Sequence, residues 1–285
     1  MYQATRPDAE GNLTQRTHTN SGEVWLYSYD HRNRLTRAQH KASAGGAVDR
    51  QVDYQYDALG NRIRRDDDPD GSGPQAASVA KFAYESGNAR ADLDAAGSLT
   101  TRRFYFAALD SVFARLDAAG TAAWYLTDRL GSVRDIVDAA GTLQDHLDYD
   151  PWGKVVTETN PAFGDRVKFT AREWDAALGA YYSRARIYSP EMRRFWQEDP
   201  LSFSAGDANL YRYVGNGPTL LTDPSGQIGW FPIIVGIAIL AAGGAGAYYG
   251  ATTEKNPVWS KDSSLGGDRA ARRERLSQTA SQSKE

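Results

Sequence analysis

Cysteine is absent from all 285 residues of this chain, and the absence excludes several kinds of chemistry at once. Without cysteine there can be no disulfide, no thiolate nucleophile and no cysteine-based zinc site. Histidine is scarce as well: His18, His31, His40 and His146 show no metal-ligand spacing. No phosphate loop, dinucleotide fingerprint or nucleophile elbow occurs. We therefore expect no metabolic enzyme, no cofactor and no bound metal.

The chain also lacks an excess of charge and a targeting segment. Its formal net charge is −3, which gives no electrostatic reason for nucleic-acid binding. The first residues have no basic stretch followed by an apolar one, so no signal peptide is expected. Residues 11–14 already read as the start of a repeat strand, so we expect the chain to be the tail of something longer.

Tyrosine and glycine, by contrast, recur in a regular pattern from residue 8 to about residue 155. Tyr-x-Tyr-Asp occurs at 27–30 and 54–57, with a variant at 147–150, and Asp-Ala-Ala-Gly occurs at 94–97, 117–120 and 138–141. Aspartate opening a turn that ends in a left-handed glycine is a common hairpin connection. Between turns, Val52, Tyr54 and Tyr56 alternate with polar residues, which is the period of a strand. These patterns predict an all-β fold of antiparallel hairpins.

Residues 66–73 read Asp-Asp-Asp-Pro-Asp-Gly-Ser-Gly, with carboxylates at alternate positions before a glycine. Calcium loops share that arrangement, but they place a glutamate at the twelfth position, which is Ala77 here. We therefore interpret the stretch as a solvated acidic loop between strands.

The segment from Arg186 to Gly226 holds the most distinctive motifs. Two Asp-Pro pairs, at 199–200 and 223–224, bracket an aromatic run at 209–214 that predicts a strand. Together with residues 125–134 (Tyr-Leu-Thr-Asp-Arg-Leu-Gly-Ser-Val-Arg) and 181–186, these motifs resemble the bacterial Rhs/YD-repeat proteins. The resemblance covers roughly residues 10–226, and its last part is similar to the Rhs-associated core.

The resemblance implies a ribbon of β-hairpins that spirals into a hollow shell, with the core closing one end and a variable cargo beyond it. It also implies self-cleavage shortly after the second Asp-Pro motif, with Asp199, Asp223 and Arg186 as catalytic residues. Two carboxylates held close cannot both ionise, so one can act as an acid while the other activates water. The alternative is that both aspartates only cap turns before proline.

Two departures from the family pattern bear on these expectations. Ser202 stands where the family usually has glycine; if the position requires a positive φ, serine there costs about 1 kcal/mol. The repeats are also too few to enclose a full cavity, so the chain is either a truncated gene remnant or a piece that completes the shell of a partner. The expected partners are therefore the remainder of a repeat shell or a secretion apparatus, with an immunity protein as a further candidate.

From residue 224 to residue 253 no side chain is charged. A helix formed by an uncharged stretch of this length is long enough to cross a bilayer. Aromatic residues lie near both ends and small residues recur between them, as in membrane helices. We expect a hydrophobic helix within 227–253, inserting in a membrane through 228–250, and a disordered polar tail at 254–285. The alternative is a Gly/Ala-rich cargo helix held in the shell.

The sequence thus divides into YD repeats (1–155), an Rhs-associated core (156–226), the hydrophobic segment and the tail. Two functions remain open. In one, the chain is the end of a bacterial polymorphic toxin whose core frees a short membrane-active segment. In the other, it is a non-enzymatic, membrane-anchored surface or interaction protein with purely structural aspartates. Both place it at a membrane, in secretion or at the cell surface.

Overall fold

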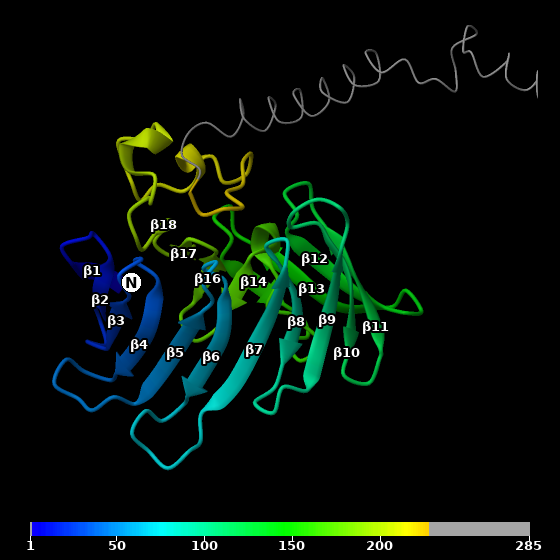
Figure 1. Cartoon of the computed structure of the whole chain (residues 1–285), viewed down its shortest axis with the longest axis horizontal. Coiled ribbons are helices and arrows are strands. Elements are labelled where there is room, and N and C mark those ends of the chain that lie inside the picture. The colour runs from blue at the N-terminus through cyan, green and yellow to red at the C-terminus, as the bar shows by residue number, and fades with distance from the viewer. Residues whose placement is uncertain (1, 228–285) are drawn as a thin grey trace, which may run out of the picture. The chain divides into compact units, whose positions relative to one another are not determined.

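The computed structural model describes residues 2–227 and consists of two antiparallel sheets with short 3-10 turns (Figure 1). The larger sheet has fourteen strands, each paired with its neighbours in the sequence. They are β1 (Tyr2–Pro7), β2 (Leu13–His18), β3 (Val24–Tyr29), β4 (Leu35–Lys41), β5 (Arg50–Tyr56), β6 (Arg62–Asp68), β7 (Ser78–Glu85), β8 (Asn88–Leu93), β9 (Leu99–Tyr105), β10 (Val112–Asp117), β11 (Ala122–Thr127), β12 (Val133–Asp138), β13 (Leu143–Tyr149) and β14 (Val155–Glu158). The expected all-β fold of antiparallel hairpins is confirmed.

The smaller sheet belongs to the segment after residue 158. Its four strands are β15 (Glu173–Asp175), β16 (Ala180–Ser183), β17 (Arg186–Ser189) and β18 (Arg194–Phe195), in sequence order. Three 3-10 turns accompany it: η1 (Phe169–Ala171), η2 (Ser202–Ala205) and η3 (Val214–Asn216). Residues 2–227 belong to one compact unit.

The aspartates of the repeats build the turns. The Oδ1 atom of Asp117 accepts hydrogen bonds from the backbone N–H groups of Ala119 and Thr121, at 2.9 and 2.8 Å. The Oδ1 atom of Asp138 accepts the equivalent bonds from Ala140 and Thr142, both at 2.9 Å. The glycines that end these turns, Gly120 and Gly141, both have a φ of 81°. Only glycine adopts that conformation without strain, so the turn chemistry read from the sequence is confirmed.

The tyrosine before each of the three repeat aspartates holds the open end of a hairpin. The hydroxyls of Tyr29, Tyr56 and Tyr149 donate to the carbonyl oxygens of Leu13, Leu35 and Val133, at 2.8, 2.7 and 2.8 Å. Each acceptor is the first residue of the preceding strand. The Tyr-Asp pair of the repeat therefore has two structural roles. The tyrosine fixes the end of one hairpin, and the aspartate caps the turn that leads to the next hairpin.

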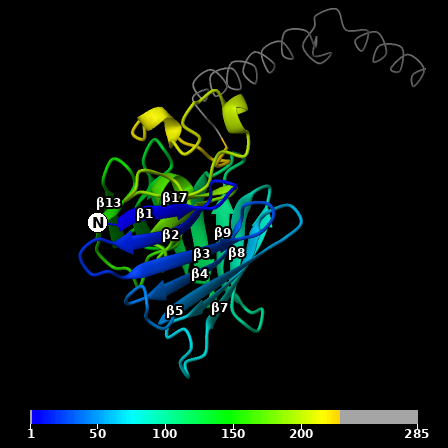
Figure 2. The same ribbon diagram turned by 90° about the vertical axis from the view of Figure 1, so that its left-hand side faces the viewer.

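The main core lies where the small sheet packs on one face of the large one (Figures 1 and 2). One cluster joins β2–β5 to the segment 177–196, and a second joins β9–β13 to Val167 and Ala171. Trp196 is fully buried in the first cluster, with its ring 4.6 Å from that of Tyr27. Replacing such a tryptophan with alanine typically costs 3–5 kcal/mol. The Rhs-associated core segment (156–226), which contains Trp196, is thus part of the same folding unit as the large sheet.

Buried ion pairs connect the same layers. Arg103 of β9 binds both oxygens of Asp92 on β8, at 2.7 and 2.8 Å, and also contacts Asp165 of the core segment. Arg166, from that segment, binds Asp92 as well. Charges buried in this way are tolerated because each has partners.

Two expectations need correction. Residues 209–214 do not form a strand: only an isolated bridge between Arg212 and Arg194 is present, and the run ends in η3. Of the expected loop 66–73, residues 69–73 do lie in the loop between β6 and β7, but residues 66–68 belong to β6, where Asp67 binds Arg50 and Arg65. Strand pairing and cross-strand ion pairs outweighed the turn preference of aspartate there.

The expected hydrophobic helix (227–253) and polar tail (254–285) lie outside the residues that the structure describes, apart from Gln227. Within residues 2–227, no helix has the length and apolar character needed to cross a membrane.

Candidate functional site

Arg186, the first residue of β17, is the centre of the candidate site. A two-residue turn joins β16 to β17, and Ser183 pairs with Arg186 across it. The Arg186 side chain is 1% exposed, and its guanidinium carbon lies 3.6 Å from the centre of the Phe195 ring. Arginine suits this position because its flat guanidinium group stacks on an aromatic face. The N–H donors lie in the plane of the guanidinium group and stay free to bind neighbouring oxygen atoms.

The structure brings together all three residues that the family resemblance implies. Arg186 Nη2 lies 2.8 Å from Asp199 Oδ2 and 3.4 Å from Asp223 Oδ2. Both aspartates are buried, and they come from the two Asp-Pro motifs, which are 24 residues apart. The two carboxylates therefore converge on one nitrogen atom, an arrangement that sequence separation alone could not establish.

The second motif is held through its backbone. The carbonyl oxygen of Asp223 accepts the hydroxyl of Ser183 at 3.3 Å, and that of Ser225 accepts the N–H of Ala185 at 3.3 Å. Arg186 Nε donates to the carbonyl oxygen of Gly226. Arg186 therefore contacts the Gly226 carbonyl group as well as both aspartate carboxylates.

Gly226 cannot carry a side chain in this position. Its φ is 67°, and a Cβ atom there would lie 2.1 Å from the carbonyl oxygen of Ser183. The backbone of the second motif therefore approaches the β16–β17 turn more closely than any other residue type allows.

Burial sets the electrostatics of the site. It raises the pKa of Asp199 above the ordinary value, even though the charge of Arg186 acts in the opposite direction. Burial likewise lowers the pKa of Arg186, against the charges of Asp199 and Asp223. Asp223 has more hydrogen-bond partners than Asp199 on its Oδ1 atom. This atom accepts hydrogen bonds from the N–H groups of Gly226 and Gln227, at 2.9 and 3.2 Å, and from the Ser225 hydroxyl, at 3.1 Å.

A second group of residues holds Pro224 and was not expected to be part of the site. Arg172 and Arg184 both donate to the Pro224 carbonyl oxygen and both bind Asp110, in the loop between β9 and β10. No spacing in the sequence connects Asp110 to residues more than 60 positions away, so only the fold reveals this contact.

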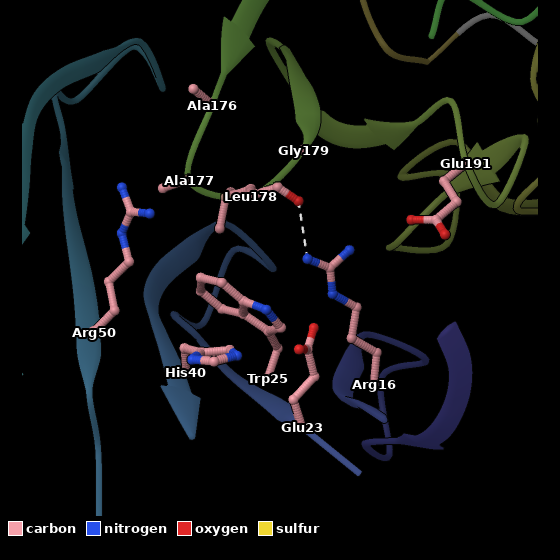
Figure 3. A pocket seen from close by; sticks show the side chains of 10 residues that line it. All are labelled: Arg16, Glu23, Trp25, His40, Arg50, Ala176, Ala177, Leu178, Gly179 and Glu191. Carbon is pink, nitrogen blue, oxygen red and sulfur yellow. Dashed lines mark hydrogen bonds between the residues drawn. The ribbon is translucent and has the colours of Figure 1, made fainter. Parts of the chain in front are cut away.

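The large sheet and the Rhs-associated core segment (156–226) also line pockets that are open to solvent. One, of about 390 Å³, lies over the rings of Trp25 and His40, which are 5.0 Å apart (Figure 3). Arg16 spans it and donates to the carbonyl oxygen of Leu178, at 3.0 Å. That contact joins β2 to the β15–β16 turn. Within residues 2–227, no cluster of three or more histidine or carboxylate side chains could hold a metal ion.

Comparison with known proteins identifies the family. The family model of the teneurin YD-shell matches residues 46–219, more than half of the chain, and that of the RHS repeat matches residues 8–48. The chain belongs to the RHS/YD-repeat shell family. The YD-shell resemblance drawn from the sequence is thereby confirmed.

Two similar members of this family have curated names. The toxin protein Tse5 of Pseudomonas aeruginosa is 30% identical over 256 residues, which is 81% of this chain and 19% of Tse5. The tRNA(Glu)-specific nuclease WapA of Bacillus subtilis subsp. natto is 28% identical over 239 residues, which is 81% of this chain and 9% of WapA. This YD-shell chain thus spans about a fifth or less of the length of these relatives.

Among solved structures, the crystal structure of TcdB2-TccC3 is similar to this YD-shell chain with a TM-score of 0.60 and 20% sequence identity. The match covers 77% of this chain and 11% of the other. At that identity the likeness concerns the fold alone.

Proposed function

We propose that this chain is the C-terminal part of a polymorphic toxin-type protein, and that its core cuts the peptide bond between Gly226 and Gln227. The observation that carries the proposal is the convergence of Asp199 and Asp223 on Arg186, beside the carbonyl group of Gly226. The reaction is the hydrolysis of one peptide bond in the same chain, so it occurs once.

The two aspartates differ in the way that such a reaction requires. Asp199 has a raised pKa and keeps a proton more readily, which fits the general acid that protonates the leaving amine. Asp223 accepts three hydrogen bonds on its Oδ1 atom, which hold the carboxyl group in place, and we assign it the role of the base that takes a proton from water. Water adds its hydroxyl to the carbonyl carbon, and the amine leaves with the proton from Asp199.

Arg186 supports this chemistry in two ways. Its Nε donor polarises the Gly226 carbonyl and stabilises the negative charge that develops on the oxygen during attack. Its Nη2 atom contacts both carboxyl groups and thereby holds them close to each other. Because the whole group is buried, each of these interactions is stronger than it would be in water.

The proposed product is the segment that follows the cut, which carries the charge-free stretch 228–253. We propose that this segment is membrane-active, through residues 228–250, and that the protein is secreted or displayed at the cell surface. The partners that fit this role are the remainder of a repeat shell, a secretion apparatus and an immunity protein. Similarity to Tse5 supports a toxin role at the level of the family.

Replacing either aspartate with asparagine tests the proposal. Asparagine keeps the shape of the side chain and one acceptor oxygen but can neither donate a proton as an acid nor accept one as a base. We expect the parent chain to be cut and the Asp199→Asn and Asp223→Asn variants to stay intact, as seen by denaturing gel and mass spectrometry. Near-ultraviolet circular dichroism would establish that both variants fold.

Asp150→Asn is the matched control. Asp150 also precedes a proline and accepts two backbone N–H groups, from Trp152 and Lys154, both at 2.9 Å. It has the same role as a turn cap, so this variant should be cut like the parent. Equal cutting in all four chains, or no cutting in the parent, would contradict the proposal.

A structural role for the aspartates is the second candidate. It is favoured by the hydrogen bond that Asp199 Oδ1 accepts from the N–H of Leu201, at 2.9 Å, which is typical of a turn cap. In that case the protein is a non-enzymatic surface or interaction module. Its expected result is an intact parent chain and a loss of stability, with no change in mass, in both variants.

A further inference from the structure

The outward face of the large sheet, opposite the core, changes in character along the sheet. On β4 and β5 this face carries polar side chains that bind one another across the strands. Arg37 binds Asp53 at 2.6 Å, and Gln39 donates to Gln51 at 2.7 Å. On β9 to β13, which lie side by side in Figure 1, the same face carries apolar side chains instead. The second half of the face is therefore not a surface that suits contact with water.

Five of these apolar side chains form one row across the strands. The row consists of Phe104 (β9), Ala114 (β10), Trp124 (β11), Val137 (β12) and Leu143 (β13), and each residue is the register partner of the next. Register partners in an antiparallel sheet point to the same face. The side chains of Tyr105 and Tyr125 point to the other face, where they belong to the core. The row thus lies on the face away from the core.

Three further side chains, Phe106, Phe113 and Leu126, widen the row. The Phe113 ring lies 4.5 Å from that of Phe106 and 6.3 Å from that of Trp124. Leu126 follows Trp124 by two residues on β11, so it points to the same side. The row and these three residues together form one contiguous surface, the apolar patch.

Much of the apolar patch faces solvent. Phe106 is 65% exposed, and Trp124, Leu126 and Leu143 are each about half exposed. A fully covered aromatic side chain buries about 150–250 Å², and on that scale the patch exposes roughly 400 Å². A contiguous apolar area of this size on a protein surface marks an interaction site.

Opposite charges border the row at opposite corners. Arg102 of β9 is exposed and makes no ion pair within residues 2–227; it pairs with Leu116 on one side of the row. Asp135 of β12 pairs with Leu126 on the other side of the row. Asp135 binds the ring of His146 at 2.6 Å, yet its side chain is still 29% exposed. The surface thus carries a positive corner, an apolar middle and a negative corner.

We propose that the apolar patch is the docking surface for a second copy of this chain, related to the first by a two-fold axis. In such an interface the same patch of each copy meets the other. An axis through the centre of the row, close to Trp124, exchanges the two corners. Arg102 of each copy then faces Asp135 of the other, so the patch is complementary to itself in charge as well as in apolar character. The two sheets cross at close to a right angle, which is one of the two ways in which sheets pack face to face.

The size of the patch sets the strength of the contact. Two copies bury roughly 800 Å² of exposed apolar surface between them, and the polar rim adds to this area. Specific interfaces begin at about 1,200 Å² in total, so this one belongs to the small, reversible class. We expect a dissociation constant in about the micromolar range. The dimer forms on the outward face, whereas Arg186 and the two Asp-Pro motifs lie with the small sheet on the opposite face.

Sedimentation velocity of the full chain at increasing concentration tests this inference. The parent should double in mass as the concentration passes through the micromolar range, whether or not the chain is cut, because the interface lies within residues 2–227. Trp124→Ser should weaken the dimer at least about tenfold, since it removes the aromatic side chain at the centre. Leu59→Ser is the matched control: Leu59 is 87% exposed, in the turn between β5 and β6, and its loss should change nothing. Association that Trp124→Ser does not weaken would involve another part of the chain and would overturn the inference.

Charge reversal tests the two-fold arrangement separately. Arg102→Glu and Asp135→Arg should each weaken the dimer, because each places like charges opposite one another at both corners. An equimolar mixture of the two variants should restore association, since one corner then pairs the new Glu with the new Arg and the other keeps the native pair. Circular dichroism would establish that both variants fold. A mixture that associates no better than either variant alone would overturn the inference, and so would a parent chain that stays monomeric up to about 100 μM, well above the expected range.

Discussion

Arg186 Nη2 lies 2.8 Å from Asp199 Oδ2, and this buried contact connects the first Asp-Pro motif to the start of β17. The same guanidinium binds Asp223 and the carbonyl oxygens of Leu210 and Gly226. One side chain thus joins three segments that are distant in the sequence, which is why the site forms only in the folded core.

Arg186→Lys should disable the site. A lysine ammonium has three donors at one point and cannot reproduce the planar fork that contacts both carboxylates and two carbonyls. We expect no self-cleavage and a loss of about 3–5 kcal/mol in the free energy of unfolding, because two buried carboxyl groups lose part of their partner. The cut fraction and urea unfolding measure the two effects. Arg37→Lys, which changes an exposed pair with Asp53, should leave both unchanged.

Ser202→Gly should stabilise the protein. Ser202 has a φ of 51°, so the serine that replaces the usual glycine of the first motif is strained, as the sequence predicts. Removing that strain is expected to add about 1 kcal/mol to the free energy of unfolding, measured in urea. Ser204→Gly is the control, because Ser204 has no positive φ and should gain nothing. This account would be contradicted if Ser204→Gly raised the free energy of unfolding while Ser202→Gly left it unchanged.

Gly226→Ala and Gly141→Ala separate backbone strain from crowding. Both glycines have a positive φ, but a Cβ atom at Gly141 meets no atom within 4 Å, whereas at Gly226 it meets the Ser183 carbonyl. Gly141→Ala should cost about 1–2 kcal/mol of stability and leave self-cleavage intact. Gly226→Ala should displace the second motif and abolish cleavage. Cleavage at the parent rate in Gly226→Ala would show that the close approach is dispensable.

Acid should destabilise the protein through the Asp92 ion pairs. Burial alone raises the pKa of Asp92, but the charges of Arg103 and Arg166 outweigh it and hold the pKa below the usual value. A folded pKa below the unfolded one, which is about 4, gives a stabilisation that is present above that pH and is lost as the pH falls.

Asp92→Asn should therefore reduce this acid sensitivity. The variant is expected to lose about 3 kcal/mol at pH 7, because Arg103 and Arg166 each lose one of their two buried counter-charges and keep only Asp165 and Glu173 respectively. Its free energy of unfolding should then fall less steeply than that of the parent below pH 5. Urea unfolding at several pH values measures both slopes, and identical slopes would contradict this role of Asp92.

The repeats could be predicted because their information is local. Alternation of Val52 and Tyr54 and the aspartate-to-glycine turns specify hairpins without reference to distant residues. Residues 209–214 misled the sequence analysis, since an aromatic run resembles a strand but Tyr213 instead packs against Tyr188 and Phe195 in the core. Tertiary packing decided the structure of that run.

The candidate site was predictable only in part. Asp199, Asp223 and Arg186 came from the family resemblance, and their contact distances required the fold. Asp110 carries no motif at all, because its partners Arg172 and Arg184 reach it from a different sheet. The hydrophobic segment 228–250 was recognised by composition, and its membrane role stays a prediction.

Intact mass of the purified full chain tests the central claim most directly. The account predicts two species, with the larger one ending at Gly226, and a single full-length species for Asp223→Asn prepared in parallel. A parent chain that remains 285 residues long, under conditions in which circular dichroism shows it folded, would contradict self-cleavage by this site.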